Sequence, residues 1–142
     1  MKKILGTLSV ITLMLVCLTG CGSISTLECN GEIDGQKVNY VATLKGDNVT
    51  EVEVNSEYIA ESEEVAKTSA EYLEKYLANI YGDSSETGIS ITSKAEGKKV
   101  ISNIKLDVKK LSKSTLDEQF GNNKLTKKSF KEFAEDSGLT CK

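Results

Sequence analysis

The sequence of 142 residues contains no histidine, proline or tryptophan, and all 18 of its basic residues are lysine. Without histidine, the chain cannot assemble a Ser-His-Asp or Cys-His catalytic arrangement or a zinc site with imidazole ligands. Without arginine, it lacks the planar donor fork that binds carboxylates and phosphates through two bonds. The chain also has no Gly-rich phosphate loop and no Gly-x-Ser-x-Gly motif. These absences predict a protein that is not an enzyme and that binds no cofactor and no metal ion.

The first twenty residues have the pattern of an export signal. Two lysines precede an apolar run over residues 4–16, which is too short to cross a bilayer as a helix. The signal ends in residues 18–21, Leu-Thr-Gly-Cys, which resemble the lipobox of bacterial lipoproteins. That resemblance implies cleavage between Gly20 and Cys21 and a diacylglyceryl group on the Cys21 sulfur.

A diacylglyceryl group anchors a protein stably to the membrane, because two acyl chains keep it attached, whereas a single acyl chain binds the membrane reversibly. We therefore expect residues 1–20 to be a signal peptide, 21–26 the lipidated cysteine with a short tether, and 27–142 a single domain. The expected location is the extracytoplasmic face of the cell membrane, within about 15–20 Å of it.

Two cysteines remain in the expected domain, Cys29 near its start and Cys141 near its end. Outside the cytoplasm such a pair most often forms a disulfide. In the chain-entropy model, a bridge across so long a loop stabilises the fold by about 4.7 kcal/mol. The alternatives are two free thiols or a redox pair, although a redox pair would lack the Cys-x-x-Cys motif.

Charge is unevenly distributed along the chain. Residues 28–96 hold 15 acidic residues and 5 lysines, whereas residues 97–142 hold 6 acidic residues and 11 lysines. An anionic lipid or wall polymer is therefore a candidate partner, whereas nucleic acid is not expected because no aromatic residues interleave with the lysines. The alternative is an ordinary solvated surface. The candidate contact residues lie on a predicted hairpin and its exit: Lys98, Lys99, Lys105, Lys109, Lys110 and Lys113.

Residues 24–45 have the alternating pattern of a β-hairpin around Asp34-Gly35, a pair typical of two-residue turns. That turn pairs Cys29 with Tyr40 and places the apolar residues on one face. For the next connection, a two-residue turn at positions 46 and 47 would direct Glu51 and Glu53 inward. We therefore predict a three-residue loop over residues 46–48, which pairs Leu44 with Thr50 and Ala42 with Val52.

Residues 63–81 have the clearest helical pattern, with Ser62 placed to cap the start and Gly82 to end it. Its tyrosines are expected in the core. The apolar stripe contains Val65, Ser69, Tyr72, Leu73, Tyr76, Leu77 and Ile80.

A second hairpin is predicted around Glu96-Gly97, with Ile91 opposite Ser102. Residues 114–120 are expected to form a short helical turn. A last helix is expected over residues 127–137, with Thr126 as its cap and Gly138 after its end. The lysines at its start and the acidic residues at its end oppose the helix dipole, each at a cost of about 0.3–1 kcal/mol.

These elements predict an α+β fold of order β-β-β-α-β-β-α, an antiparallel sheet of about five strands with two helices on one face and a polar, wet opposite face. Residues 41–50, Val-Ala-Thr-Leu-Lys-Gly-Asp-Asn-Val-Thr, follow the lipobox and a short strand. This layout resembles the small YehR-like bacterial lipoproteins. The resemblance implies the fold and the location, and it transfers no site residues.

Three hypotheses of function follow. The leading one is a lipid-anchored, non-enzymatic binding protein or accessory envelope factor. It would use the wet sheet face or the lysine-rich second half to contact an envelope protein or an anionic lipid or wall polymer. The second is a small-ligand carrier with a pocket between sheet and helices, lined by Tyr40, Tyr58, Tyr72 and Tyr76. The third is a hydrolase that uses the carboxylates of Glu61, Glu63 and Glu64.

Overall fold

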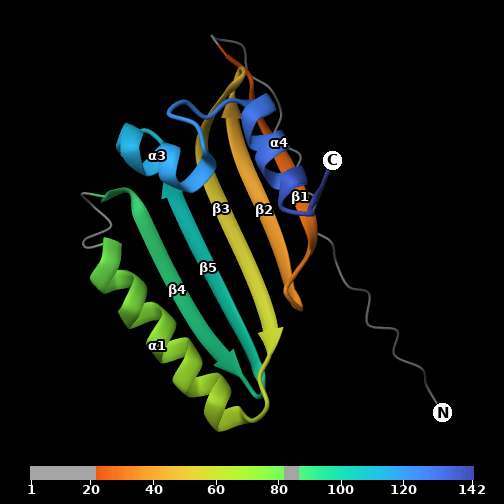
Figure 1. The fold of residues 1–142 in the computed structure, drawn as a ribbon, viewed down its shortest axis with the longest axis vertical. Helices are drawn as coiled ribbons and strands as arrows, with labels where there is room; N and C mark the ends of the chain where they lie inside the picture. Colours follow the sequence, from red (N-terminus) through yellow and green to blue (C-terminus); the bar gives the residue numbers. More distant parts are fainter. Residues whose placement is uncertain (1–21, 82–86) are drawn as a thin grey trace, which may run out of the picture.

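The structure, a computed structural model, describes residues 22–81 and 87–142. Within these ranges the chain forms an open six-stranded antiparallel sheet with three helices against one face (Figure 1). The predicted α+β class is confirmed, with a short sixth strand and a third helix in addition. The elements are β1 (Ile24–Ile33), β2 (Gln36–Lys45), β3 (Asn48–Ile59), α1 (Glu63–Tyr81), β4 (Ile89–Glu96), β5 (Lys99–Asp107), α3 (Lys113–Phe120), α4 (Lys127–Asp136) and β6 (Thr140–Cys141).

The strands are arranged in the order β4-β5-β3-β2-β1-β6. The register predicted for the first hairpin is confirmed, because Cys29 lies opposite Tyr40. Both turn residues, Asp34 and Gly35, have positive φ (51° and 78°), as a type I′ turn requires. On the other side of β1, Cys29 lies opposite Cys141 of β6 and is joined to it by a disulfide.

The turn between β2 and β3 differs from the predicted three-residue loop. It has two residues, and Leu44 pairs with Val49 rather than with Thr50. A bulge after position 43 takes up the extra residue, so that Ala42 still pairs with Val52. The bulge therefore lets both valines reach the core, where they are 4% and 0% exposed.

The predicted register of the second hairpin is also wrong. The turn consists of Gly97 and Lys98, and Ile91 pairs with Ile104 rather than with Ser102. Glycine at the first turn position, with φ 61°, supplies the positive φ that such hairpin turns need. On the face that the helices cover, this register pairs apolar residues with apolar residues, except for Ser93 and Ser102, whose hydroxyls bond to each other.

Helix α1 packs on β4 and β5 through small residues. Ala66 and Ala70 are buried in one cluster with Val100 of β5. The predicted core position of the tyrosines is therefore wrong: the helix lies on its alanines, and the larger side chains lie beside the contact. The predicted cap is present, with the Val65 amide donating to Ser62 Oγ at 3.2 Å, whereas Gly82 lies outside the described residues. The exposed apolar side chains of the helix are Val65, Tyr72, Tyr76 and Ile80.

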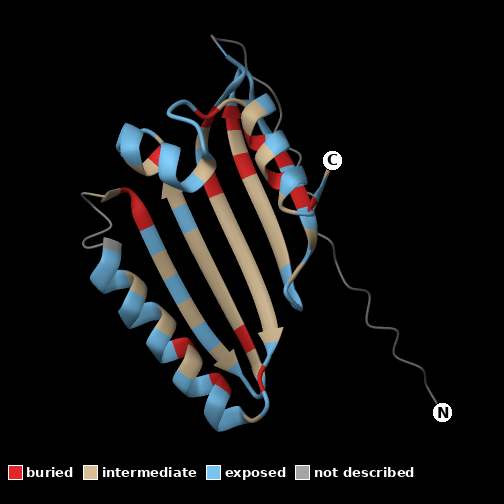
Figure 2. Cartoon of the chain, in the orientation of Figure 1, coloured by how far each residue is buried: buried red, intermediate tan, exposed pale blue. Residues whose placement is uncertain are grey.

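Helix α4 closes the larger core over β1 and β2, where Phe130 is completely buried. Its predicted cap is confirmed as a capping box between Thr126 and Ser129. Gly138, with φ 88°, follows its end as predicted. Figure 2 shows buried residues gathered under α4 and at the foot of α1, whereas the strands between the two helices are mostly half-buried. On the helix-bearing face, α1 therefore covers the strands near one edge of the sheet and α4 those near the other edge, and the middle of this face is partly open.

Candidate functional site

The chain enters the sheet at one end of the strands. Gly22, the first described residue, lies beside Lys45, since a β-carbon added to Gly22 would be 3.3 Å from Lys45 Cγ. The Gly46 amide donates to the Ser23 carbonyl at 3.2 Å. Because Cys21 directly precedes Gly22, a lipid on Cys21 would hold this end toward the membrane. We call residues 22–23, 45–48 and 107–128 the anchor end.

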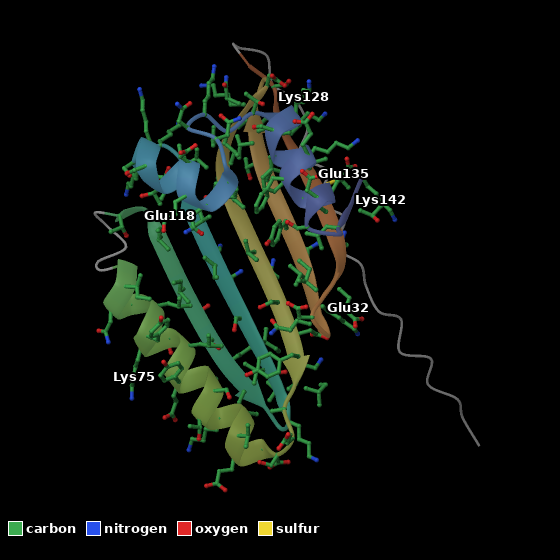
Figure 3. The ribbon with its side chains drawn as sticks, viewed as in Figure 1. Glu32, Lys75, Glu118, Lys128, Glu135 and Lys142 are labelled. Atoms are coloured by element: carbon green, nitrogen blue, oxygen red, sulfur yellow. A yellow bond between two sulfur atoms is a disulfide. The ribbon has the colours of Figure 1, made fainter. Side chains whose placement is uncertain are left out.

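Backbone hydrogen bonds bring the C-terminal segments to the anchor end. The Lys127 amide donates to the Asp47 carbonyl at 2.9 Å, and the Val108 amide donates to the Thr50 carbonyl at 3.1 Å. Four acidic residues lie in the anchor end, Asp47, Asp107, Asp117 and Glu118, against seven lysines. Figure 3 labels Lys128 at this end of the molecule. The seven lysines are all exposed: Lys45, Lys109, Lys110, Lys113, Lys124, Lys127 and Lys128.

The opposite end of the sheet has the reverse balance of charge. Residues 31–37, 57–67 and 94–99, which we call the far end, contain seven acidic residues and five lysines. Among residues 22–81 and 87–142, positive charge is therefore concentrated where the chain continues toward Cys21. Such a separation orients a protein in the field of a charged surface.

The structure does not bring the six predicted contact lysines together. Lys109, Lys110 and Lys113 lie in the anchor end, whereas Lys98 and Lys99 lie at the far end, about 30 Å away along the nine residues of β5. Lys105 lies on the outer face of the sheet, with Nζ 3.8 Å from Glu53. The other four lysines of the anchor end are Lys45 of β2, Lys124 before α4, and Lys127 and Lys128 in the first turn of α4.

The outer face of the sheet, away from the helices, is polar as predicted, and its groups pair with one another. Asn103 donates to Glu53 at 2.6 Å and to Asn55 at 2.7 Å. Lys99 lies 3.4 Å from Glu57. Exposed pairs of this kind contribute only about 0–1 kcal/mol each. Because these charges already have partners, this face is a weaker candidate contact surface than the anchor end.

On the helix-bearing face, two adjoining hollows lie over the strands between α1 and α4. Their volumes are about 350 and 180 Å³, and both are lined by Leu77 and Ile104. We call the two hollows together the slot. The first is lined by Gln36, Ser56, Tyr58, Ser69, Tyr72, Leu73, Leu77, Ile91, Ser102 and Ile104. The second, beneath α3, is lined by Tyr40, Val54, Leu77, Ile89, Ile104, Leu106, Leu111, Thr115, Gln119, Phe120 and Phe133.

Three of the four predicted pocket tyrosines line the slot. Tyr58 and Tyr72 line the first hollow and Tyr40 the second. Tyr76 stacks on Tyr72, with ring centroids 5.4 Å apart, but it lines neither hollow. Tyr40 stacks on Phe133, and burial raises the pKa of the Tyr40 hydroxyl. The slot is therefore an apolar environment with aromatic side chains on its floor and walls.

The predicted carboxylate candidates, Glu61, Glu63 and Glu64, are exposed at the far end. Within residues 22–81 and 87–142, no group of three or more His, Cys, Asp or Glu side chains is placed to hold a metal ion. No described helix is both long enough and apolar enough to cross a bilayer. The predicted cleavage and lipidation residues, Gly20 and Cys21, lie outside the described residues.

Two solved structures have the same fold. The NMR structure of E. coli YehR matches with a TM-score of 0.67 and 14% sequence identity, over 84% of this chain and 91% of YehR. The NMR structure of a protein from Streptococcus pneumoniae TIGR4 matches with a TM-score of 0.53 and 14% identity, over 100% of this chain and 98% of that one. The chain therefore has a YehR-like fold. No family model and no curated protein matches its sequence.

Proposed function

We propose that this chain is a lipid-anchored protein of the extracytoplasmic face of the cell membrane, and that it acts there by binding or as an accessory envelope factor rather than as an enzyme. The lipobox-like residues 18–21 support the anchor. The observation that carries the proposal is the position of seven exposed lysines around the point where the chain continues to Cys21. These lysines would rest on anionic lipid headgroups.

The charges of α4 support this contact. Lys127 and Lys128 occupy its first turn, which has no acidic residue, and its last turn has no basic residue. This arrangement costs about 0.3–1 kcal/mol for each opposed charge. A lysine close to an anionic membrane gains about 1 kcal/mol. Part of this cost is offset within the helix, where Lys128 Nζ lies 3.8 Å from Glu132 Oε1 and Lys131 Nζ lies 3.6 Å from Glu135 Oε1. Contact with anionic lipid would offset the rest, and violations of this kind are typical of functional surfaces.

Lysine footprinting of the full-length chain tests the contact. The protein is placed in vesicles of phosphatidylcholine with or without phosphatidylglycerol, and its amines are acetylated and located by mass spectrometry. We expect Lys109, Lys113 and Lys124 to be protected only in the anionic vesicles, and to regain reactivity at 1 M salt because screening shortens the Debye length to about 3 Å. Lys75 and Lys98 are controls within the same molecule. Equal reactivity of all five lysines in both vesicles would refute the contact.

A second candidate function, a carrier of a small ligand, is favoured by the slot. Its combined volume falls in the range of about 300–1,000 Å³ that is usual for ligand pockets. The two functions are compatible, because none of the seven lysines lines the slot.

A further inference from the structure

The residues that line the slot include no charged side chain. This is unusual in a chain of which 27% of the residues are charged. Its polar groups are hydroxyls and amides, and the Ser102 hydroxyl is already bonded to Ser93 at 2.9 Å. Burying an unpaired ionised ligand group in such a site is costly. The slot therefore selects a neutral, largely apolar ligand.

The slot is long and narrow. It extends along β3 from Tyr58, in the first hollow, to the level of Val52, which pairs with Leu106 of the second hollow. Six residues of strand correspond to about 20 Å. Because the two hollows share the lining residues Leu77 and Ile104, a single extended chain laid along the slot would contact both. α3 covers the second hollow, where Phe120 and Phe133 make an edge-to-face pair with centroids 5.1 Å apart.

Peptide occupants do not fit these dimensions. A helix has a diameter of about 10–12 Å with its side chains, so a 20 Å length of helix occupies at least about 1,600 Å³. The hollows hold only about 350 and 180 Å³. Of the strands that line the slot, β2, β3 and β5 are paired on both sides, and the free edge of β4 is the one opposite β5. An extended peptide would therefore find no backbone partners over the middle of the sheet. A hydrocarbon chain needs no such partners.

We infer that the slot binds the single hydrocarbon chain of a neutral lipid taken from the membrane, with its hydroxyl or ester group near Ser56 and Ser69. The source of the lipid rests on the proposed function, which places the domain at the bilayer. The first hollow, which has no lining residue from α3, lies toward the far end, away from Lys45, beside which the domain's own anchor would attach. Each additional buried CH₂ group is expected to tighten binding about fourfold.

Photocrosslinking in membranes tests the inference on the full chain. A diazirine analogue of 1-hexadecanol is added to membranes that contain the protein, and the labelled peptides are identified by mass spectrometry. We expect label on the α1 segment that includes Tyr72 and Leu77, and competition by unlabelled 1-hexadecanol. Label spread over exposed segments, or label that excess hexadecanol does not reduce, would overturn the inference.

Two matched pairs of variants sharpen the test. Tyr72→Ser and Tyr76→Ser break the same aromatic stack, but only Tyr72 lines the slot; we expect labelling to fall about tenfold in the first and to persist in the second. Ser69→Asp puts a carboxylate into the slot, whereas Thr68→Asp places it on an exposed position of the same helix. Loss of labelling in Ser69→Asp alone is expected, and equal labelling of the two would contradict the inference.

The same membranes separate this inference from the proposed function. Cys21→Ala removes the proposed anchor but leaves the slot unchanged, so the labelled site must stay the same even if less protein remains on the membrane. Persistent anchoring without slot labelling would refute the inference alone. Slot labelling without any lipid on Cys21 would refute the anchor alone.

Discussion

Cys29 and Cys141 lie directly opposite each other in β1 and β6, and a disulfide of 2.00 Å joins their sulfur atoms. Cys29 is completely buried within the larger core. The bond fastens a strand of only two residues to the sheet. β6 follows α4, so the disulfide also restrains the C-terminal helix over β1 and β2.

Loss of the disulfide is expected to lower the free energy of unfolding by about 2–5 kcal/mol, because the unfolded chain loses a restraint across 112 residues. Urea unfolding of the oxidised protein, the reduced protein and Cys29→Ala/Cys141→Ala measures this. If reduction leaves the urea midpoint unchanged, the bond does not form in solution. Alkylation before and after reduction, followed by mass measurement, gives the same answer independently.

Gly88 allows a close approach that no other residue would permit. Its φ is 74°, and a β-carbon there would lie 2.6 Å from Lys110 Cβ and 3.0 Å from the Asp107 carbonyl oxygen. We expect Gly88→Ala to lower the free energy of unfolding by about 1–3 kcal/mol more than Gly121→Ala. Gly121 is the matched control, since its φ is 64° but nothing lies within 4 Å. Equal losses in urea unfolding would contradict this close contact.

The sequence predicted those elements whose signals are local. The Asp34-Gly35 turn, the Thr126 cap and the first hairpin register each depend on residues within a short distance along the chain. The predicted three-residue loop between β2 and β3 was wrong because a bulge in the pairing of these two strands sets their register. The prediction of which face of α1 packs on the sheet was wrong. Hydrophobic periodicity gives weight to large apolar side chains, whereas the helix packs on the sheet through Ala66 and Ala70.

The candidate surfaces were harder to predict, because they join residues that are far apart in sequence. Lys45, Lys109 and Lys127 lie at the same end of the sheet only because the fold places the end of β2, the segment after β5 and the start of α4 there. The six predicted contact lysines were grouped because they are close in sequence. In the structure, they are separated because β5 carries some of them to the far end and others to the anchor end. The slot was anticipated through its tyrosines, but its lack of charge depends on which side chains turn inward.

Cys21→Ala is expected to abolish metabolic incorporation of a palmitate analogue and to release the mature protein from the membrane. The reason is that two acyl chains supply stable anchoring, whereas lysine contacts alone are reversible and weakened by salt. Fractionation at low and high salt distinguishes the two contributions. A variant that stays membrane-bound at 1 M salt, with the same mature mass as the native protein, would refute the anchor.

Lys127→Glu separates stability from membrane contact. The residue is the first of α4, where a carboxylate interacts favourably with the helix dipole and a lysine does not. The variant is therefore expected to raise the free energy of unfolding by about 0.5–2 kcal/mol, while it weakens contact with phosphatidylglycerol vesicles by removing one positive charge and adding a negative one. Lys75→Glu, at an exposed position of α1 outside the anchor end, is the control for charge alone. A Lys127→Glu protein that is more stable and yet leaves the footprint of Lys109 and Lys124 unchanged would show that the lysines of the anchor end do not act together on anionic lipid.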